Sequence, residues 1–535
     1  MASYWRFGPG PMTPIRAASL VRAASLIGGL TLVSRVLGFA REMVMARLLG
    51  AGLAADAFNL AFKLPNIFRR LFAEGAFSAA FVPLFNQEKA DGGMEAAKRF
   101  AEDILSVFLP LLLLLTALAE IAMPGLLWLM NGGGGFLDVP GKFDLAVALS
   151  RLTFPYLLCI ALASLMGGIL NSLGRFAAAA AAPVLLNVVL IAAMLLAAGD
   201  GEVMTATALA WGVALAGLLQ FLWLLWACRR AGVRLRLRWP SFGPRVRRLG
   251  RTVVPAAVGA GIYQIGQLID LFFASHLPQG ALSYLNYADR LNQLPLGVVG
   301  IALGTALLPA LSRHVAEGEE AKAVHLQNRA AEMALFLALP AAAGLMVLSH
   351  PLATAFYVGG RFGGEDAAWT GHVLTGLAAG LPAYVLVKVL TPGFFARGDT
   401  ATPVKTALAA MALNVVLILL LIDRFQVAAL GWATALAAWG NCTLLYAVLR
   451  RTGAFRFDAR LRRRALGAAA ASAVMAGALW AFLSVTGLSF DGPAFERAGA
   501  VLLAVAVGGA VYFLAAALFG AMPLAELRAR LRRES

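Results

Sequence analysis

The chain has 535 residues, of which 60% are hydrophobic and 14% are charged, with a mean hydropathy of +0.78 and a net charge of +17. Soluble globular proteins of this length do not reach such an apolar content, so the composition predicts a polytopic membrane protein. The three cysteines lie in separate apolar runs, and the five histidines show no HExxH spacing, so neither a disulfide framework nor a metal enzyme is expected.

Residues 1–17 form a Gly/Pro-rich tail without the apolar core and small-residue cleavage site of a signal peptide, so we expect this tail to be retained. Apolar segments of about 20 residues or more, each long enough to cross a bilayer as a helix, follow along the chain. We predict fourteen membrane helices, at residues 18–48, 53–87, 96–131, 144–173, 177–199, 203–230, 245–275, 280–315, 320–349, 366–396, 401–422, 427–451, 462–486 and 495–520.

The basic residues of the loops predict the orientation. Arginine clusters lie at 229–251, at 450–464 and in the tail after residue 520, whereas the loops at 199–202 and 276–280 contain no Lys or Arg. Because basic loops stay on the cytoplasmic side, both termini are expected to be cytoplasmic. These clusters account for much of the net charge and suit anionic lipid headgroups, so membrane lipids are expected as partners and nucleic acid is not.

The two halves of the chain repeat each other in sequence. The matches in register are LNVVLI at 186–191 and 413–418, ALAWGVALA at 208–216 with ALGWATALA at 429–437, FVPLFNQEKADGG at 81–93 with LLPALSRHVAEGE at 307–319, and Pro155 with Pro382. Six predicted helices separate equivalent segments, so the halves run parallel, as in transporters built from two lobes about an axis along the membrane normal.

The predicted fold is therefore all-α, with about fourteen transmembrane helices in two parallel six-helix lobes plus two extra C-terminal helices. The predicted regions are an N-terminal tail (1–17), an N-lobe (18–230), a basic cytoplasmic linker (231–244), a C-lobe (245–451), helices 13 and 14 (452–520) and a basic cytoplasmic tail (521–535).

The second predicted helix carries a polar stripe. At 100° per residue, seven polar side chains fall in an arc roughly 120° wide. They are Asp56, Asn59, Lys63, Asn66, Arg70, Glu74 and Ser78. Arg69 lies off this arc on an ideal helix, but Pro65 removes a backbone hydrogen bond and can redirect the residues that follow. Such a stripe lines either a cavity or a buried seam between helices.

Further charges lie inside other predicted helices. At 1.5 Å per residue, Arg41, Lys63 and Arg290 each lie roughly 15 Å below the outer surface, with Arg35 and Arg69 a little deeper. A charge at this depth costs about 2.5–3.5 kcal/mol on insertion scales, so these groups must face one another or water. The other charges of this kind are Asp289 and Lys388.

These charges have two interpretations. They could be structural ion pairs, with the outermost residues reaching the headgroups. However, the basic residues of the set outnumber the acidic ones, so complete mutual pairing is not possible. A buried excess of arginine suits an anion, and above all a phosphate, because the guanidinium donates two parallel hydrogen bonds. The pattern therefore favours a central cavity that binds a phosphorylated substrate.

Four segments resemble the MurJ/MviN family of lipid II flippases, in the multidrug/oligosaccharidyl-lipid/polysaccharide exporter superfamily. They are SRVLGFARE at 34–42, DAFNLAFKLPNIFRRLFAEGAFSAAFVP at 56–83, YADRLNQLPLGVVGIALGTALLPALS at 287–312 and KVLTPGFFARGDTATPVK at 388–405. The resemblance extends from about residue 18 to residue 520. One departure is Gln293, where enterobacterial members carry an acid.

The resemblance implies a transporter of the bacterial inner membrane that moves undecaprenyl-diphosphate disaccharide-pentapeptide to the outer leaflet for peptidoglycan synthesis. It implies that the last two helices line a groove for the lipid tail. The implied substrate-binding residues are Arg35, Arg41, Asp56, Lys63, Asn66, Arg69, Glu74, Asp289, Arg290 and Lys388. No cofactor is expected, and any coupling would be to the membrane potential or a monovalent cation. The expected protein is a monomer whose partners include lipid II and other cell-wall synthesis proteins.

Two alternative functions stay open. A polysaccharide-lipid or multidrug exporter of the same superfamily would share the parallel repeat, but a multidrug antiporter normally has twelve helices and a cation carrier needs an acidic cavity. A membrane glycosyltransferase would need acids or a base in a sizeable loop at the membrane surface. The predicted outer loops are short and contain no such cluster.

Overall fold

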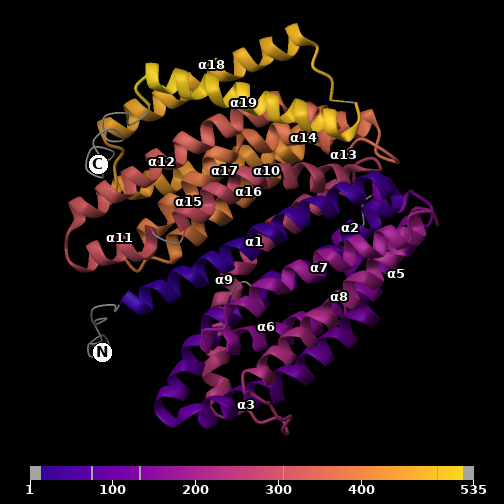
Figure 1. Cartoon of the computed structure of the whole chain (residues 1–535), viewed down its shortest axis with the longest axis vertical. Coiled ribbons are helices and arrows are strands. Elements are labelled where there is room, and N and C mark those ends of the chain that lie inside the picture. The colour runs from indigo at the N-terminus through magenta and orange to yellow at the C-terminus, as the bar shows by residue number, and fades with distance from the viewer. Residues whose placement is uncertain (1–13, 74–75, 132–133, 305–306, 491, 522–535) are drawn as a thin grey trace. The chain divides into compact units, whose positions relative to one another are not determined.

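The computed structural model describes residues 14–73, 76–131, 134–304, 307–490 and 492–521. Over these ranges the chain forms nineteen α-helices, and its strand-like pairing is an isolated bridge between Gly359 and Phe362. The predicted all-α fold is confirmed (Figure 1).

The helix bounds are as follows. The first ten helices are α1 (Pro14–Leu49), α2 (Leu53–Ala73), α3 (Ala76–Asn131), α4 (Gly134–Leu137), α5 (Lys142–Thr153), α6 (Tyr156–Ser172), α7 (Phe176–Leu196), α8 (Glu202–Arg230), α9 (Pro244–Ala274) and α10 (Ala281–Gly304). The others are α11 (Leu307–Ala316), α12 (Glu320–Val347), α13 (Ser349–Tyr357), α14 (Gly364–Ala379), α15 (Leu381–Phe395), α16 (Ala401–Phe425), α17 (Ala428–Arg451), α18 (Ala459–Thr486) and α19 (Ala494–Leu518).

The chain is a multi-pass membrane protein. Among the described residues, ten segments are long and apolar enough to cross a membrane, and they include α3, α7, α8, α12 and α16 to α19. The two others are the pairs α5 with α6 and α14 with α15. The four remaining predicted spans correspond to α1, α2, α9 and α10, and for these the crossing stays a prediction.

Several predicted helices are interrupted. The span predicted at 53–87 ends as α2 at Ala73, and α3 begins at Ala76 and continues to Asn131. Its backbone departs from helical geometry at Gly92 and Gly93, where Gly93 has a φ of +73°. A positive φ has almost no cost for glycine, so the Gly-Gly pair forms a kink in α3 at this point.

The sequence repeat is visible in the helix breaks. Pro155 separates α5 from α6, and Pro382 lies directly after the break at Gly380 between α14 and α15. Both prolines lie where a missing backbone donor and a ring clash interrupt a helix. The matched segments at 81–93 and 307–319 are mostly helical, and each turns near its end through a glycine with φ of +73°, Gly93 or Gly318.

The helices fall into two compact units. Among the described residues, those at 14–44, 60–126 and 145–261 form unit 1, and those at 45–59, 127–144 and 262–521 form unit 2.

Close helix contacts build unit 1. A Cβ at Gly217 of α8 would lie 2.6 Å from the Tyr156 ring of α6, and one at Gly212 would lie 3.1 Å from Leu190 of α7. Small residues let membrane helices approach in this way. On α3, the rings of Phe81 and Phe100 stack with their centroids 5.5 Å apart. These contacts form the apolar core of unit 1.

In unit 2, α14 and α17 cross at two glycines. A Cβ at Gly376 would lie 2.6 Å from the backbone nitrogen of Trp432, and one at Gly431 would lie 2.5 Å from the carbonyl oxygen of Val373. The two backbones are therefore in direct contact. Their neighbours α12 and α15 complete a core of mostly alanine, leucine and valine.

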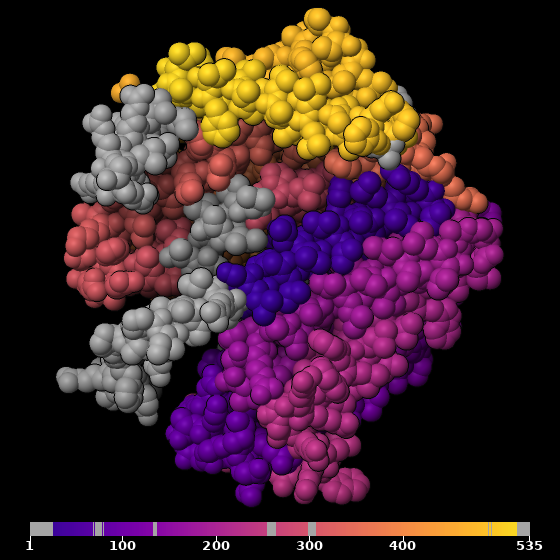
Figure 2. Space-filling model, viewed as in Figure 1, coloured from indigo at the N-terminus to yellow at the C-terminus, as the bar shows by residue number. Residues whose placement is uncertain are grey.

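Helices α18 and α19 pack side by side in unit 2 and against α12 (Figure 1). Tyr512 of α19 donates a hydrogen bond to the Phe336 carbonyl of α12 at 2.6 Å. At the other end, Glu332 of α12 pairs with Arg460 and Arg464 of α18. Figure 2 shows these two helices on the surface of the molecule. Their outward side chains are apolar, as expected for a surface that contacts lipid; they include Leu466, Trp480, Leu502, Leu514 and Leu518.

Replacing Gly431 by alanine should destabilise the protein, because the new methyl group would meet a backbone oxygen that is not free to move. Overpacking of this kind costs about 1–3 kcal/mol. The matched control is Gly477→Ala on α18, where a Cβ meets nothing within 4 Å and the better helix former should leave stability unchanged or higher. Thermal unfolding of the two purified variants tests this, and equal midpoints would contradict the close crossing.

Candidate functional site

The predicted site residues lie on helices of both units. Unit 1 holds Arg35, Arg41, Lys63, Asn66 and Arg69, and unit 2 holds Asp56, Asp289, Arg290 and Lys388. Glu74 lies outside the described residues. The substrate-binding role of the set stays a prediction, and each unit supplies its own geometry.

In unit 1, Arg41 of α1 is held on two sides. Its side chain is 8% exposed, and its Nη2 lies 2.5 Å from Oε1 of Glu42. Its Nη1 donates to Oδ1 of Asn187 on α7 at 3.2 Å. Because hydrogen bonds involving an ionised group are the stronger ones, the guanidinium has a fixed position on α1.

Asn187 is a functional candidate that was not predicted from the sequence. Its amide nitrogen donates to the carbonyl oxygens of Ser34, at 3.0 Å, and Pro183, at 3.1 Å, while its amide oxygen accepts from Arg41. Gly38 of α1 faces this amide, and a Cβ there would lie 3.6 Å from the amide nitrogen, which is an ordinary van der Waals contact. The available signal was the repeated LNVVLI segment, whose one polar residue is this asparagine.

The repeat places an equivalent asparagine in unit 2. Asn414 of α16, in the second LNVVLI segment, donates from Nδ2 to Oδ1 of Asp270 on α9 at 2.9 Å. Each lobe therefore has an asparagine on its fifth predicted helix that hydrogen-bonds a charged side chain of its first predicted helix.

On α2, Arg69 joins the polar stripe. Its Nε donates to Oδ1 of Asn66 at 3.0 Å, one helical turn earlier. Pro65 lies inside this helix directly before Asn66. Both side chains are half-buried, as is Lys63. The hydrogen bond therefore connects an arginine that lies off the ideal stripe to a residue of that stripe.

In unit 2, the Asp56 carboxylate is buried, with 1% of its side chain exposed. Its Oδ2 accepts from Lys142 Nζ at 2.8 Å and from the Gly280 backbone at 2.9 Å. Its Oδ1 accepts from the Ser283 backbone at 3.1 Å and from the Ser283 hydroxyl at 2.7 Å. The carboxylate thus satisfies the free N–H groups at the start of α10. In this conformation Asp56 joins the starts of α2, α5 and α10.

Lys142 was also missed by the sequence analysis. Its side chain is 2% exposed, and its Nζ also lies 4.6 Å from the centre of the Phe136 ring. The sequence signal is that Lys142 is the one Lys or Arg between Arg99 and Arg151. Lys and Arg are scarce in the outer loops of membrane proteins. A single lysine in a predicted outer loop is therefore a candidate partner for a buried acid.

On α10, the departure at Gln293 has a structural role. The amide nitrogen of Gln293 donates to Oδ2 of Asp289, one turn earlier. A second carboxylate at this position would repel Asp289 instead of donating to it. Arg290 is half-buried on the same helix, and Lys388 on α15 is exposed. With glutamine at 293, this turn of α10 carries one acidic side chain, Asp289, whereas an acid at 293 would add a second.

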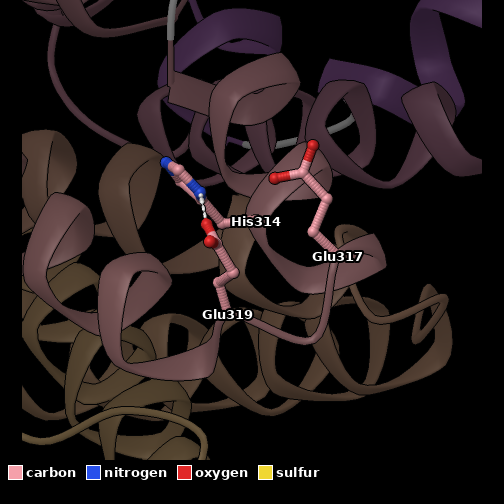
Figure 3. A group of neighbouring side chains, drawn as sticks. All are labelled: His314, Glu317 and Glu319. Atoms are coloured by element: carbon pink, nitrogen blue, oxygen red, sulfur yellow. Dashed lines mark hydrogen bonds and ion pairs between the residues drawn. The ribbon is translucent and has the colours of Figure 1, made fainter.

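Figure 3 shows another cluster of ionisable side chains, His314, Glu317 and Glu319, at the turn between α11 and α12. His314 Nδ1 lies 2.9 Å from one Glu319 oxygen, and Lys322 Nζ donates to the other at 2.6 Å. The hydrogen bonds from Lys322 and His314 lower the pKa of Glu319 below its usual value. These side-chain types could bind a divalent metal, but both oxygens of Glu319 are already engaged within the turn.

A multi-pass α-helical fold whose apolar helices also carry arginine, lysine and carboxylate side chains is typical of a polytopic membrane transporter. Two solved structures have this fold. A lipid II flippase MurJ in an inward closed conformation has a TM-score of 0.77 at 24% identity and covers 92% of this chain and 98% of its own. An inward-facing multidrug resistance MATE transporter of the MOP superfamily has a TM-score of 0.65 at 16% identity, with 81% and 98% covered.

Sequence comparisons identify the family. The family described as "Lipid II flippase MurJ" matches residues 45–492. A probable lipid II flippase MurJ of Rhizobium meliloti (strain 1021) is 44% identical over 521 residues, which cover 96% of this chain and 97% of that protein. The lipid II flippase MurJ of Burkholderia cenocepacia is 33% identical over 506 residues, with 92% and 96% covered. The chain belongs to the lipid II flippase MurJ family, whose members are transporters rather than enzymes.

Removing the positive charge at Lys142 should destabilise unit 2. Lys142→Met leaves Asp56 buried without its counter-charge, and breaking a buried pair in this way costs about 3–5 kcal/mol. The double variant Lys142→Met/Asp56→Asn should recover part of this loss, because no buried charge remains. Thermal unfolding midpoints of the single, double and parent proteins measure the effect.

The matched control is Lys322→Met, which removes a lysine that is 64% exposed and pairs with Glu319 at the α11–α12 turn. Exposed pairs are screened by water and contribute little to stability, so its midpoint should hardly change. A loss at Lys142 no larger than the loss at Lys322 would contradict the structural role of the buried pair.

Proposed function

We propose that this protein is a lipid II flippase that moves undecaprenyl-diphosphate-linked disaccharide-pentapeptide from the inner to the outer leaflet of the bacterial inner membrane. The observation that carries this proposal is family membership over almost the whole chain, at 44% identity to one relative. The matched region covers 96% of this chain and 97% of that relative.

The charge of the predicted site supports a diphosphate as the bound group. Six of its residues are basic and three are acidic. Two of those acids are engaged by groups outside the set, since Asp56 accepts from Lys142 and Asp289 accepts from Gln293. A site with this balance suits an anionic headgroup, whereas a carrier of cationic drugs needs the opposite balance.

Arg41 is the group that we propose contacts the diphosphate from α1. Its rigid support by Asn187 and Glu42 sets the direction of the guanidinium before substrate arrives. Pre-organised donors bind more tightly because less side-chain freedom is lost on binding. Arg35, Lys63, Arg69, Arg290 and Lys388 are proposed to complete the anion site, in a cavity that opens alternately to either side of the membrane.

The lipid tail requires an apolar surface continuous with the membrane. We propose that α18 and α19, the two helices outside the repeat, supply that groove. The cluster that joins them to α12 contains Met475 and Tyr512, and their outer sides expose large apolar residues. An undecaprenyl chain bound there would exchange contacts with lipid tails for contacts with apolar side chains. This exchange costs little free energy, because both surroundings are apolar.

The direction of transport follows from the orientation that we propose, with both termini in the cytoplasm. An inside-negative potential favours outward movement of an anion by about 2.3 kcal/mol per charge per 100 mV. We propose the membrane potential, or a monovalent cation gradient, as the energy source and a monomer as the working unit, which acts beside other cell-wall synthesis proteins.

Replacing Arg41 or Arg69 by alanine should sharply reduce flipping of labelled lipid II in reconstituted vesicles. Each replacement removes a charge-assisted contact with a diphosphate, worth about 1.5–3 kcal/mol. Lysine at either position should rescue only partly, because it lacks the two-pronged donor geometry. The matched control is Arg424→Ala at the exposed end of α16, which should transport normally.

A purely structural role for Arg41 gives a different result. If Arg41 only neutralises Glu42, then Arg41→Ala/Glu42→Ala should restore transport, since no buried charge is left unpaired. If Arg41 binds substrate, the double variant should stay inactive although it folds. Restored transport in the double variant would refute the diphosphate site at Arg41.

Single cysteines test the proposed orientation in whole cells. Cysteines at Gly201 and Gln279 should react with an impermeant thiol reagent added outside, because their loops lack Lys and Arg. A cysteine at Ser241, in the arginine-rich linker, should react only after the membrane is permeabilised. The opposite labelling pattern would reverse the orientation and the direction of export.

A further inference from the structure

The segment that joins α8 to α9, residues 231–243, contains neither helix nor strand and exposes large apolar side chains. Trp239 is 90% exposed, Phe242 is 67% exposed and Leu237 is 66% exposed. Single exposed apolar residues are common. Three within six residues of an irregular segment form an apolar patch, and its exposure to water is unfavourable. We call residues 234–242 the linker strap.

A buried carboxylate fixes the position of the strap within unit 1. The backbone nitrogen of Arg236 donates to Oε1 of Glu102 on α3 at 3.0 Å, and only 5% of the Glu102 side chain is exposed. Val233, directly before the strap, is 3% exposed. The strap is therefore held along α3 by a backbone contact that does not depend on its own side chains.

The contact with α3 sets the depth of the strap relative to the membrane. Glu102 and Asp103 immediately precede a run of α3 that carries no charged residue until Glu120. That run belongs to a membrane span, and its exposed side chains include Leu111 and Leu113. A carboxylate pair directly before such a run lies at the level of the lipid headgroups. The strap, bound to this pair, lies at the same level.

The arginines of the strap are available to lipid phosphates. Arg238 Nε lies 3.5 Å from Glu102, and its Nη1 lies 3.7 Å from Asp103, while 49% of its side chain is exposed. Arg234 is exposed as well. The guanidinium has five N–H donors and its side chain is half-exposed, so a lipid phosphate can bind it beside the carboxylates.

We propose that the linker strap is a membrane-surface anchor that inserts Trp239 and Phe242 into the interface of the bilayer and binds anionic phospholipid headgroups through Arg234 and Arg238. Tryptophan prefers the headgroup level, where its ring is partly buried and its N–H reaches water. Basic residues at a membrane surface add about 1 kcal/mol each toward anionic lipid. In the proposed orientation this surface is the inner leaflet, from which the proposed lipid substrate is transported.

Spin-label accessibility in nanodiscs tests the anchor with the full-length protein. Cysteine is placed at position 239 or 242, in a background with Cys159, Cys228 and Cys442 replaced, and then labelled with a nitroxide. Both labels should collide several-fold more with oxygen, which concentrates in lipid, than with a water-soluble nickel complex. The matched control is a label at Glu95, which is 76% exposed on α3 and about 10 Å before Glu102 along the helix, where nickel should dominate.

A second arm isolates the contribution of charge. The labels at 239 and 242 should lie less deep in nanodiscs of phosphatidylcholine alone than in nanodiscs that contain phosphatidylglycerol. The double substitution Arg234→Gln/Arg238→Gln should remove this difference in depth. Labels at 239 and 242 that are as accessible to nickel as the label at 95 would overturn the anchor. A depth that is equal in both lipid mixtures would overturn the binding of anionic headgroups.

Discussion

The cost of placing charge in an apolar environment controls this structure. Asp56 illustrates the constraint, because its buried carboxylate receives a lysine, two backbone N–H groups and a hydroxyl, and so uses both oxygens completely. Four donors from α5 and α10 therefore converge where α2 begins. Any movement that separates these three helix ends must supply Asp56 with other partners or water, since a buried carboxylate without them is costly. The cluster thus makes unit 2 resist partial opening at this point.

The same constraint explains which features the sequence could predict. Hydrophobic runs longer than a bilayer is thick permit few structures other than helices, so the all-α fold and the ten apolar spans follow from composition and length. The breaks at Pro155 and Gly380 were not predicted, because they interrupt the spans expected at 144–173 and 366–396, although the repeat had matched Pro155 with Pro382. The charged helices are predictable as a group, because so many charges in apolar helices require polar surroundings.

The partners of individual charges were not predictable, because they depend on contacts between residues far apart in the chain. Lys142 lies 86 residues from Asp56, and Asn187 lies 146 residues from Arg41. Helical periodicity places a residue on a face but does not identify what that face meets. Arg69 shows the opposite limit, since its bond to Asn66 is local and follows from three-residue spacing. An alignment of the two repeats would have drawn attention to Asn187 and Asn414.

The two repeat-related asparagines show how duplicated lobes can acquire different charges on one framework. Asn187 uses its amide oxygen to accept from Arg41, whereas Asn414 uses its amide nitrogen to donate to Asp270. An amide carries both a donor and an acceptor, so it can support a base in one lobe and an acid in the other. A carboxylate or a lysine in its place would suit only one sign of charge. The asparagine shared by the two repeats can therefore hydrogen-bond a first helix of either charge.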